Sequence, residues 1–148
     1  MNREINDVVA LPEPGSHIVF SPEGQHLAYS TFDHIWVIDM QTKVGRVVVD
    51  QHSEYPNVLV ENPTFSHDGK WLLFGLTWDD TDEFDLATVD IDGSNMVRLH
   101  IKGLNSRPEF SPDGTQILSI CEGDGVVGFE ICIMNSDGRE RKHLTNVE

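Results

Sequence analysis

The chain contains few cysteines and no long apolar run. Its 148 residues include only Cys121 and Cys132, and one pair is too little for the disulfide framework of a small secreted domain. We therefore expect both to be buried, reduced thiols. No stretch approaches the 18 apolar residues of a membrane-spanning helix, so no membrane insertion is predicted. Residues 1–7 lack the apolar run of a signal peptide, which predicts a cytoplasmic protein if the sequence is complete.

Positive charge is also scarce. Lysine and arginine number 10 against 25 aspartates and glutamates, a net charge of −15. A protein that binds a phosphate backbone needs clustered lysine and arginine, so nucleic acid is excluded as a partner. A protein partner with a basic surface, or a cation, suits this charge better. Acid that serves only solubility is the simplest alternative.

Catalytic motifs are missing as well. There is no G-x-S-x-G turn, which excludes the hydrolase domain of a peptidase. The seven histidines are scattered, with no H-x-x-x-H pair. An acid–base pair assembled from different repeats, for example His52 or His34 with Arg107, stays open because such sites can draw on several repeats. The sequence otherwise predicts no catalytic residue and a protein that is not an enzyme.

What the chain does contain is a repeat. The phrase F-S-x-[DE]-G begins at Phe20, Phe65 and Phe110, at a constant spacing of 45 residues. Its proline sets the first corner of a tight turn, its acid suits the second, and its glycine takes the left-handed position that closes a hairpin. A period in the forties, built of short strands, predicts propeller blades rather than a helical solenoid. The predicted turn residues are Pro22, Gly24, Asp68, Gly69, Pro112, Asp113 and Gly114.

Each repeat divides into four strands, A to D. Strand B, for example residues 71–74, is apolar on both sides, so both of its faces must be covered. Strand D mixes charged and apolar residues, as an edge strand does. We predict an all-β propeller fold with antiparallel four-stranded blades at about residues 15–50, 58–101 and 105–146, preceded by an extra strand at about 5–10. A β-sandwich of about a dozen strands is the alternative, which the in-phase repeats disfavour.

The motif resembles the WD40-like blades of the TolB type. The likeness rests on the F-S-P-[DE]-G phrase and on residues 133–145, which read I-M-N-S-D-G and then, after five residues, L-T. Similar blades occur in TolB, in propellers attached to prolyl-oligopeptidase-like peptidases and in oligogalacturonate lyases. The resemblance implies half of a six-bladed propeller, which a homodimer would complete. A fragment of a longer gene product is the alternative.

In a propeller, the B-to-C and D-to-A loops share one mouth. Here these loops vary in length, and variable loops on a rigid scaffold commonly bind ligands. Twelve of the 25 acids lie on them or on their flanks, among them Asp50, Glu61 and Glu130, with Lys102 also nearby. We therefore predict that this mouth binds a basic protein partner. Its predicted residues are Asp33, Glu54, Asp79, Asp80, Asp82, Glu83, Asp85, Arg107, Glu122 and Asp124.

No cofactor is predicted. The acidic run at residues 79–83 could ligate Ca²⁺, but it lacks the ligand spacing and the central glycine of an EF-hand loop. Two other functions stay open by resemblance: an enzyme or enzyme fragment acting on acidic oligosaccharides, and the propeller remnant of a prolyl-oligopeptidase-like peptidase. The acidic mouth opposes the first, because it would repel a polyanion unless a bound cation reversed the local field.

Overall fold

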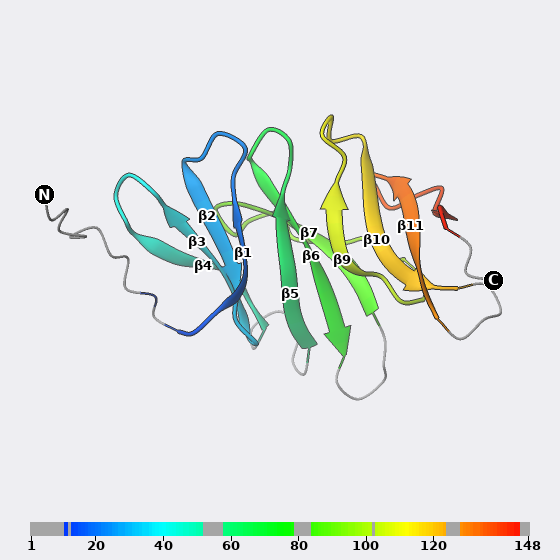
Figure 1. Ribbon diagram of the computed structural model, residues 1–148. Helices are drawn as coiled ribbons and strands as arrows, with labels where there is room; N and C mark the ends of the chain where they lie inside the picture. Colours follow the sequence, from blue (N-terminus) through cyan, green and yellow to red (C-terminus); the bar gives the residue numbers. More distant parts are fainter. Residues whose placement is uncertain are drawn as a thin grey trace, which may run out of the picture.

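The computed structural model describes residues 11, 13–51, 58–78, 84–101, 103–123 and 128–145. These residues form three four-stranded antiparallel sheets, here called blades 1 to 3, which follow one another along the chain (Figure 1). The innermost strands β1, β5 and β9 lie next to one another on the side that would face the ring axis. The all-β propeller fold class predicted from the repeat is confirmed. The predicted strand at about 5–10 lies outside the described residues.

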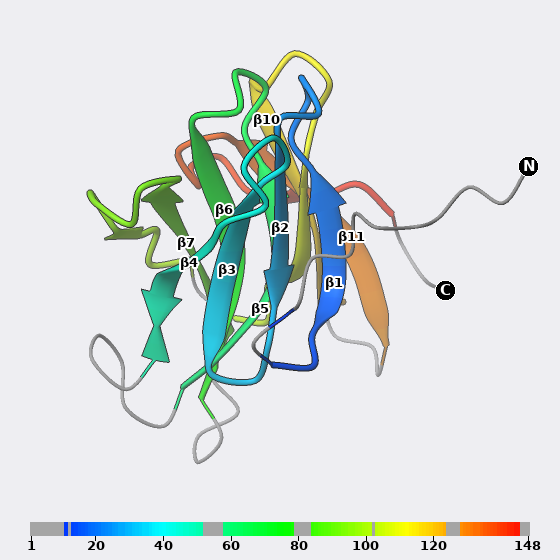
Figure 2. The ribbon, with the colours of Figure 1, turned by 90° about the vertical axis from the view of Figure 1, so that its left-hand side faces the viewer.

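Every blade is a meander in which sequential strands pair. Blade 1 comprises β1 (Ser16–Phe20), β2 (His26–Ser30), β3 (His34–Asp39) and β4 (Gly45–Asp50). Blade 2 comprises β5 (Val58–Phe65), β6 (Trp71–Trp78), β7 (Phe84–Asp90) and β8 (Val97–Arg98). Blade 3 comprises β9 (Ser106–Phe110), β10 (Gln116–Glu122), β11 (Phe129–Asn135) and β12 (Lys142–His143). Seen from the blade 1 side, β1 to β4 cross the sheet in order, with the other blades behind (Figure 2).

The three A-to-B turns have the same geometry. Gly24, Gly69 and Gly114 adopt φ of 71°, 69° and 72°, the left-handed region that glycine enters without a steric penalty. The N–H of each glycine donates to the carbonyl of the serine three residues earlier, at 2.8, 2.9 and 2.8 Å. The blade 2 turn keeps this bond although His67 replaces the proline of the other two. Hydrogen bonding and glycine therefore suffice for this turn.

In two of the turns the serine hydroxyl also donates to the aspartate two residues later. Ser66 Oγ lies 2.7 Å from Asp68 Oδ1, and Ser111 Oγ lies 2.6 Å from Asp113 Oδ1. The Ser111 bond, followed by bonds from the Thr115 backbone and hydroxyl, lowers the pKa of Asp113 to about 2. The pKa of Asp68 is lowered too, chiefly by Ser66. Both carboxylates are ionised at neutral pH and accept these bonds.

Apolar residues fill the spaces between blades. Leu72 belongs to the cluster shared with blade 1, whereas the adjacent Leu73 belongs to the cluster shared with Phe110 and Ile117 of blade 3. Successive side chains of a strand point to opposite faces, so blade 2 is covered on both sides and both leucines are fully buried. This is why strand B is apolar throughout.

The faces of blades 1 and 3 that point away from blade 2 carry apolar residues at the same repeat positions, but no described residues of another blade pack on them. Phe65 and Phe110 are 5% and 9% exposed, but Phe20, the equivalent residue of blade 1, is 59% exposed. On the other side, Ile131 of blade 3 is 42% exposed, whereas its blade 2 equivalent Leu86 is fully buried. The fold therefore presents two apolar faces, one at each end of the stack.

The prediction of reduced thiols was wrong, because Cys121 and Cys132 form a disulfide. Both are fully buried, as expected. In the β10–β11 pairing, Ser119 lies opposite Cys132 and Cys121 lies opposite Glu130. The two cysteines are thus diagonal neighbours on one face, with Cα atoms 5.8 Å apart, inside the usual range for a disulfide. Among the described residues, no helix is long and apolar enough to cross a membrane.

Replacing Ser111 with alanine should raise the pKa of Asp113 from about 2 toward the ordinary value of 3.8, because the largest lowering interaction is lost. A group whose pKa is lowered on folding stabilises the fold above its unfolded pKa and loses that effect as the pH falls through the folded value. The Asp113 contribution is therefore lost between about pH 4 and pH 2. Carboxyl NMR titration measures the shift, and Asp68 is the internal control. An unchanged Asp113 pKa in Ser111→Ala would contradict this account.

Candidate functional site

Each innermost strand has a bulge at the same repeat position. His17, Asn62 and Arg107, which are 45 residues apart, adopt φ of 50°, 51° and 49°. The pairing of each innermost strand with its neighbour shifts register at this point. Left-handed φ costs a residue other than glycine roughly 1–2 kcal/mol, and bulges re-aim side chains. The repeat thus places one polar side chain from every blade on the axis side.

These three side chains meet at one hollow. They line a groove of about 350 Å³ together with Glu109 and adjacent strand residues. A neighbouring hollow of about 450 Å³ shares all three, and it adds apolar walls that include Ile120 and Phe129. Within the described part of the chain, neither the Arg107 guanidinium nor the Asn62 side-chain amide has a hydrogen-bond or ion-pair partner. The hollow therefore offers free N–H donors beside apolar surface.

Sequence reasoning found Arg107 in this group but missed His17 and Asn62. The signal was present: a polar residue stands three positions before the phenylalanine of every F-S-x-[DE]-G phrase. Nothing in the residue types, however, predicts a left-handed backbone at all three positions. Only the pairing registers show that these residues occupy bulges and face one hollow.

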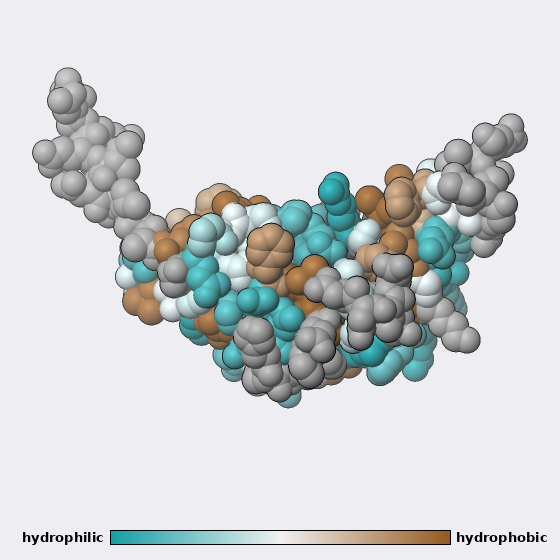
Figure 3. Space-filling view, turned by 90° about the horizontal axis from the view of Figure 1, so that it is seen from below, coloured by the Kyte–Doolittle hydropathy of each residue, from teal (hydrophilic) through white to brown (hydrophobic). Residues whose placement is uncertain are grey.

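The predicted mouth residues are only partly described. Asp33 is half-buried in the connection between β2 and β3, Glu122 is exposed at the end of β10, and Arg107 is exposed at the axial hollow. Seen from below, the described surface of this mouth mixes hydrophilic and hydrophobic residues, and hydrophobic ones occur on the blade 1 side as well as toward blade 3 (Figure 3). The remaining predicted residues lie outside the described chain, apart from Asp85: they are Glu54, Asp79, Asp80, Asp82, Glu83 and Asp124.

Asp85 has a structural environment. Its carboxylate is 1% exposed and pairs with the Arg98 guanidinium, which stacks 4.3 Å above the Trp78 ring. It also accepts backbone N–H bonds from Leu86, His100 and Ile101, at 2.8, 3.1 and 2.9 Å. Asp85 thereby ties β8 and the chain that follows it to β7. Its carboxylate does not contribute to the surface of the mouth.

The same pair position recurs in blade 3. Glu130 and His143 stand 45 residues after Asp85 and Arg98. His143 Nδ1 lies 2.6 Å from Glu130 Oε2, and the Glu130 side chain is 3% exposed. Blades 2 and 3 thus each close their outer edge with a buried carboxylate and a partner on the short strand D.

His34 lies between two carboxylates rather than with Arg107. Its Nδ1 is 3.2 Å from Glu13 Oε2, and its Nε2 is 3.7 Å from Asp50 Oδ1. Both hollows that Arg107 lines contain His17 instead. His52, the other histidine considered for an acid–base pair, lies outside the described residues.

These features define three blades of a β-propeller with a polar axial hollow. The structure is similar to the protein assigned as TolB in Agrobacterium tumefaciens, with a TM-score of 0.76 and 20% identity over 93% of this chain and 51% of that one. It is similar to an oligogalacturonate lyase from Vibrio parahaemolyticus, with a TM-score of 0.73 and 15% identity over 95% and 43%. Porphyromonas gingivalis dipeptidyl peptidase 4 gives a TM-score of 0.63 and 12% identity over 88% and 25%.

At these identities the likeness shows the fold alone, and the TolB-type propeller fold predicted from the repeat is confirmed. The likeness extends to enzymes, a lyase and a peptidase. The chain spans about half the length of the Agrobacterium protein. No family model matches the sequence, and no curated protein matches it.

Asp85→Asn should destabilise the fold by about 3 kcal/mol, because a buried charge pair loses one partner. This value is at the lower end of the usual loss of stability for a broken buried ion pair, because the Arg98 side chain is 29% exposed and stays partly hydrated. The matched control is Glu122→Gln on exposed surface, where changes stay within about 0.5 kcal/mol. Urea unfolding followed by tryptophan fluorescence measures both. Equal effects of the two variants would contradict a structural role for Asp85.

Proposed function

We propose that this chain is half of a six-bladed, TolB-like propeller that closes its ring with a second copy and serves as a scaffold for binding another protein. The observation that carries the proposal is the pair of apolar end faces. An uncovered apolar face of this kind marks an interaction surface, and repeat arrays need a cover on their terminal units.

The two end faces repeat faces that are already packed inside the stack. The free face of blade 3 presents Leu118, Ile131 and Leu144, which stand 45 residues after Leu73, Leu86 and Leu99 of the blade 2 face that packs on blade 3. The free face of blade 1 presents Phe20 and Leu27, which stand 90 residues before Phe110 and Ile117. Blade 3 of one copy therefore matches blade 1 of another through the contact already used between blades 2 and 3.

This pairing closes a ring. Two copies related by a two-fold axis that coincides with the central axis of the ring would form the contact between blade 3 and blade 1 twice. No apolar end face would then stay uncovered. Burying an exposed phenylalanine such as Phe20 is worth about 1.5–3 kcal/mol. Two such contacts, each with several apolar residues, would therefore hold the copies together.

The proposed binding surface is the mouth that carries the B-to-C and D-to-A loops. Its described acids Asp33, Asp50, Glu61 and Glu122 are exposed or half-buried, and Glu109 is exposed beside the axial hollow. Carboxylates gathered at one mouth attract a basic segment and steer it toward the axis. Asp85 is buried, so it contributes to this surface only by holding β8 and the chain that follows it against β7.

A second candidate function rests on the axial hollow. The Arg107 guanidinium and the Asn62 amide are free donors among the described residues, and guanidinium groups bind carboxylates well. The Vibrio oligogalacturonate lyase has the same blade fold. An acidic oligosaccharide is therefore the alternative ligand, and the surrounding acids oppose it.

Assembly is tested by multi-angle light scattering of the full chain at several concentrations. We expect twice the mass of one chain, and the mass of a single chain for Phe20→Glu, because a charge would be buried at each blade contact. Phe32→Glu is the control, since Phe32 is 81% exposed in the β2–β3 connection away from the end faces. A wild-type chain that is folded and monomeric would contradict the proposal that a second copy closes the ring.

Partner chemistry is tested with a fluorescent lysine-rich octapeptide. The double variant Asp33→Asn/Glu122→Gln should weaken its binding roughly two- to thirtyfold, since exposed charge pairs contribute about 0.2–1 kcal/mol each. Added salt should weaken wild-type binding as well. The control Asp137→Asn/Glu140→Gln changes the net charge equally, but in the β11–β12 turn at the opposite mouth.

Equal weakening by both double variants would mean that only net charge matters and would contradict a specific acidic mouth. Oligogalacturonate is titrated in parallel. Binding of that polyanion, lost in Arg107→Ala, would favour the second candidate function over the first.

A further inference from the structure

We propose that the reduced chain binds a zinc ion through Cys121, Cys132 and His143, and that the disulfide is the metal-free state of the same site. The proposal goes beyond the scaffold function and does not depend on it. It concerns the inner space between blades 2 and 3, not the end faces or the mouth.

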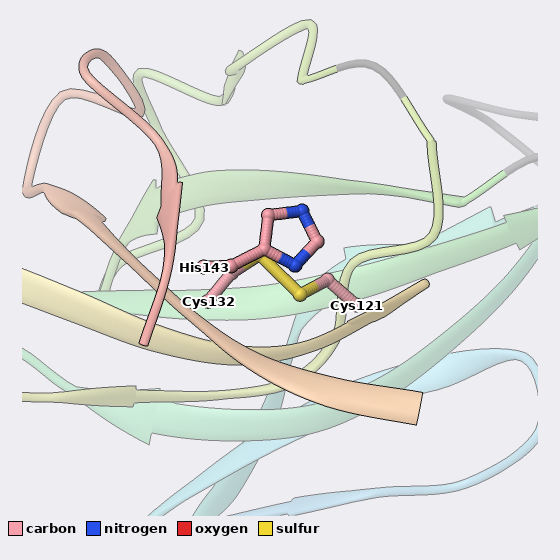
Figure 4. Close-up of side chains that lie close together, drawn as sticks. All are labelled: Cys121, Cys132 and His143. Carbon is pink, nitrogen blue, oxygen red and sulfur yellow. A yellow bond between two sulfur atoms is a disulfide. The ribbon is translucent and has the colours of Figure 1, made fainter. Parts of the chain in front are cut away.

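The three side chains are already gathered. The His143 imidazole lies beside the two sulfur atoms (Figure 4), and one ligand atom from each residue lies within 4.8 Å of the others. Sulfur and imidazole nitrogen are the donors that zinc prefers, at about 2.3 and 2.0–2.1 Å, which sets ligand atoms roughly 3.5–3.8 Å apart in a tetrahedron. Once the disulfide opens, rotation of the three side chains must bring these atoms from within 4.8 Å to this separation.

Glu130 supplies the orienting group that zinc-bound histidines usually have. Its Oε2 lies 2.6 Å from His143 Nδ1, and its side chain is 3% exposed. A carboxylate that accepts a hydrogen bond from one ring nitrogen fixes the imidazole ring and makes it a better metal ligand. Ser119, opposite Cys132 in the sheet, has a buried hydroxyl without a partner among the described residues, and it can donate to a thiolate.

The repeat shows that the ligand set is particular to blade 3. In blade 2 the positions 45 residues earlier hold Leu76, Ala87 and Arg98, where Leu76 and Ala87 belong to the apolar cluster shared with blade 1. The buried carboxylate is present in both blades, as Asp85 and as Glu130. Blade 3 therefore keeps the structural acid and replaces its three neighbours with zinc-binding residue types.

The exchange between the two states balances. A dithiol reductant attacks one sulfur of the disulfide, forms a mixed disulfide and then closes its own disulfide, so that two electrons and two protons convert Cys121 and Cys132 to thiols. Zinc binding then displaces the two thiol protons. Three protein ligands leave the fourth position open to water. Oxidation of the thiols by a disulfide of suitable potential releases the metal and restores the cross-link.

The test uses the full chain, reduced with a phosphine under nitrogen and titrated with Co²⁺, a spectroscopic substitute for zinc. We expect one ion per chain, thiolate-to-cobalt charge-transfer absorption, tetrahedral visible bands, and displacement of Co²⁺ by Zn²⁺. About two protons should be released per ion. The unreduced protein should show none of these signals.

His143→Gln and Glu130→Gln are the informative variants, because both retain the disulfide and can be checked for folding in the oxidised form. Glu130→Gln should lower metal affinity by about 10- to 100-fold, and His143→Gln should lower it further. His67→Gln, on the exposed A-to-B turn of blade 2, is the matched control. Absence of tetrahedral cobalt in the reduced wild type, or equal affinity in wild type and His143→Gln, would overturn the proposal.

Discussion

Packing of one blade face on the next is the interaction on which the rest of this structure depends. A four-stranded sheet with two apolar faces cannot bury either face alone, so its stability comes from its neighbours. Leu72 and Leu73 show this, since adjacent residues that point to opposite faces are both fully buried in blade 2. The equivalent positions at the ends of the stack lack that cover among the described residues. The further copy that we propose would cover them through the same contact that builds the interior.

The three repeats share their backbone conformation but differ in the side chains that could bind a ligand. Backbone features recur at 45-residue intervals: the glycine that closes each A-to-B turn, and the left-handed bulge of each innermost strand. The side chains on the bulges differ, being His17, Asn62 and Arg107. Positions whose backbone is constant and whose side chains vary are where a repeat protein acquires binding specificity. The axial hollow is the place where the three blades contribute side chains of different chemistry.

The sequence predicted the strand order and turns because local patterns control them. The F-S-x-[DE]-G phrase marks every A-to-B hairpin, and strands that are apolar on both sides require cover on both faces. The Cys121–Cys132 disulfide was missed because it depends on the register of β10 against β11, which places residues eleven apart on one face. Asp85 was grouped with loop acids by its position beside an acidic run. Its burial depends on the distant Arg98 and on three backbone donors, which composition does not reveal.

The cross-link stands where apolar packing is thinnest. Among the described residues, thirteen buried apolar side chains form the contact between blades 1 and 2, but six form the one between blades 2 and 3. Blade 3 presents Ser119 and Cys121 at the positions where blade 2 presents the larger apolar Phe74 and Leu76. A disulfide that closes a short loop contributes about 3 kcal/mol, and a zinc ion holding the same strands would offset the missing burial in the same way. A covalent or metal link between the strands of blade 3 thus compensates for the small apolar contact between blades 2 and 3.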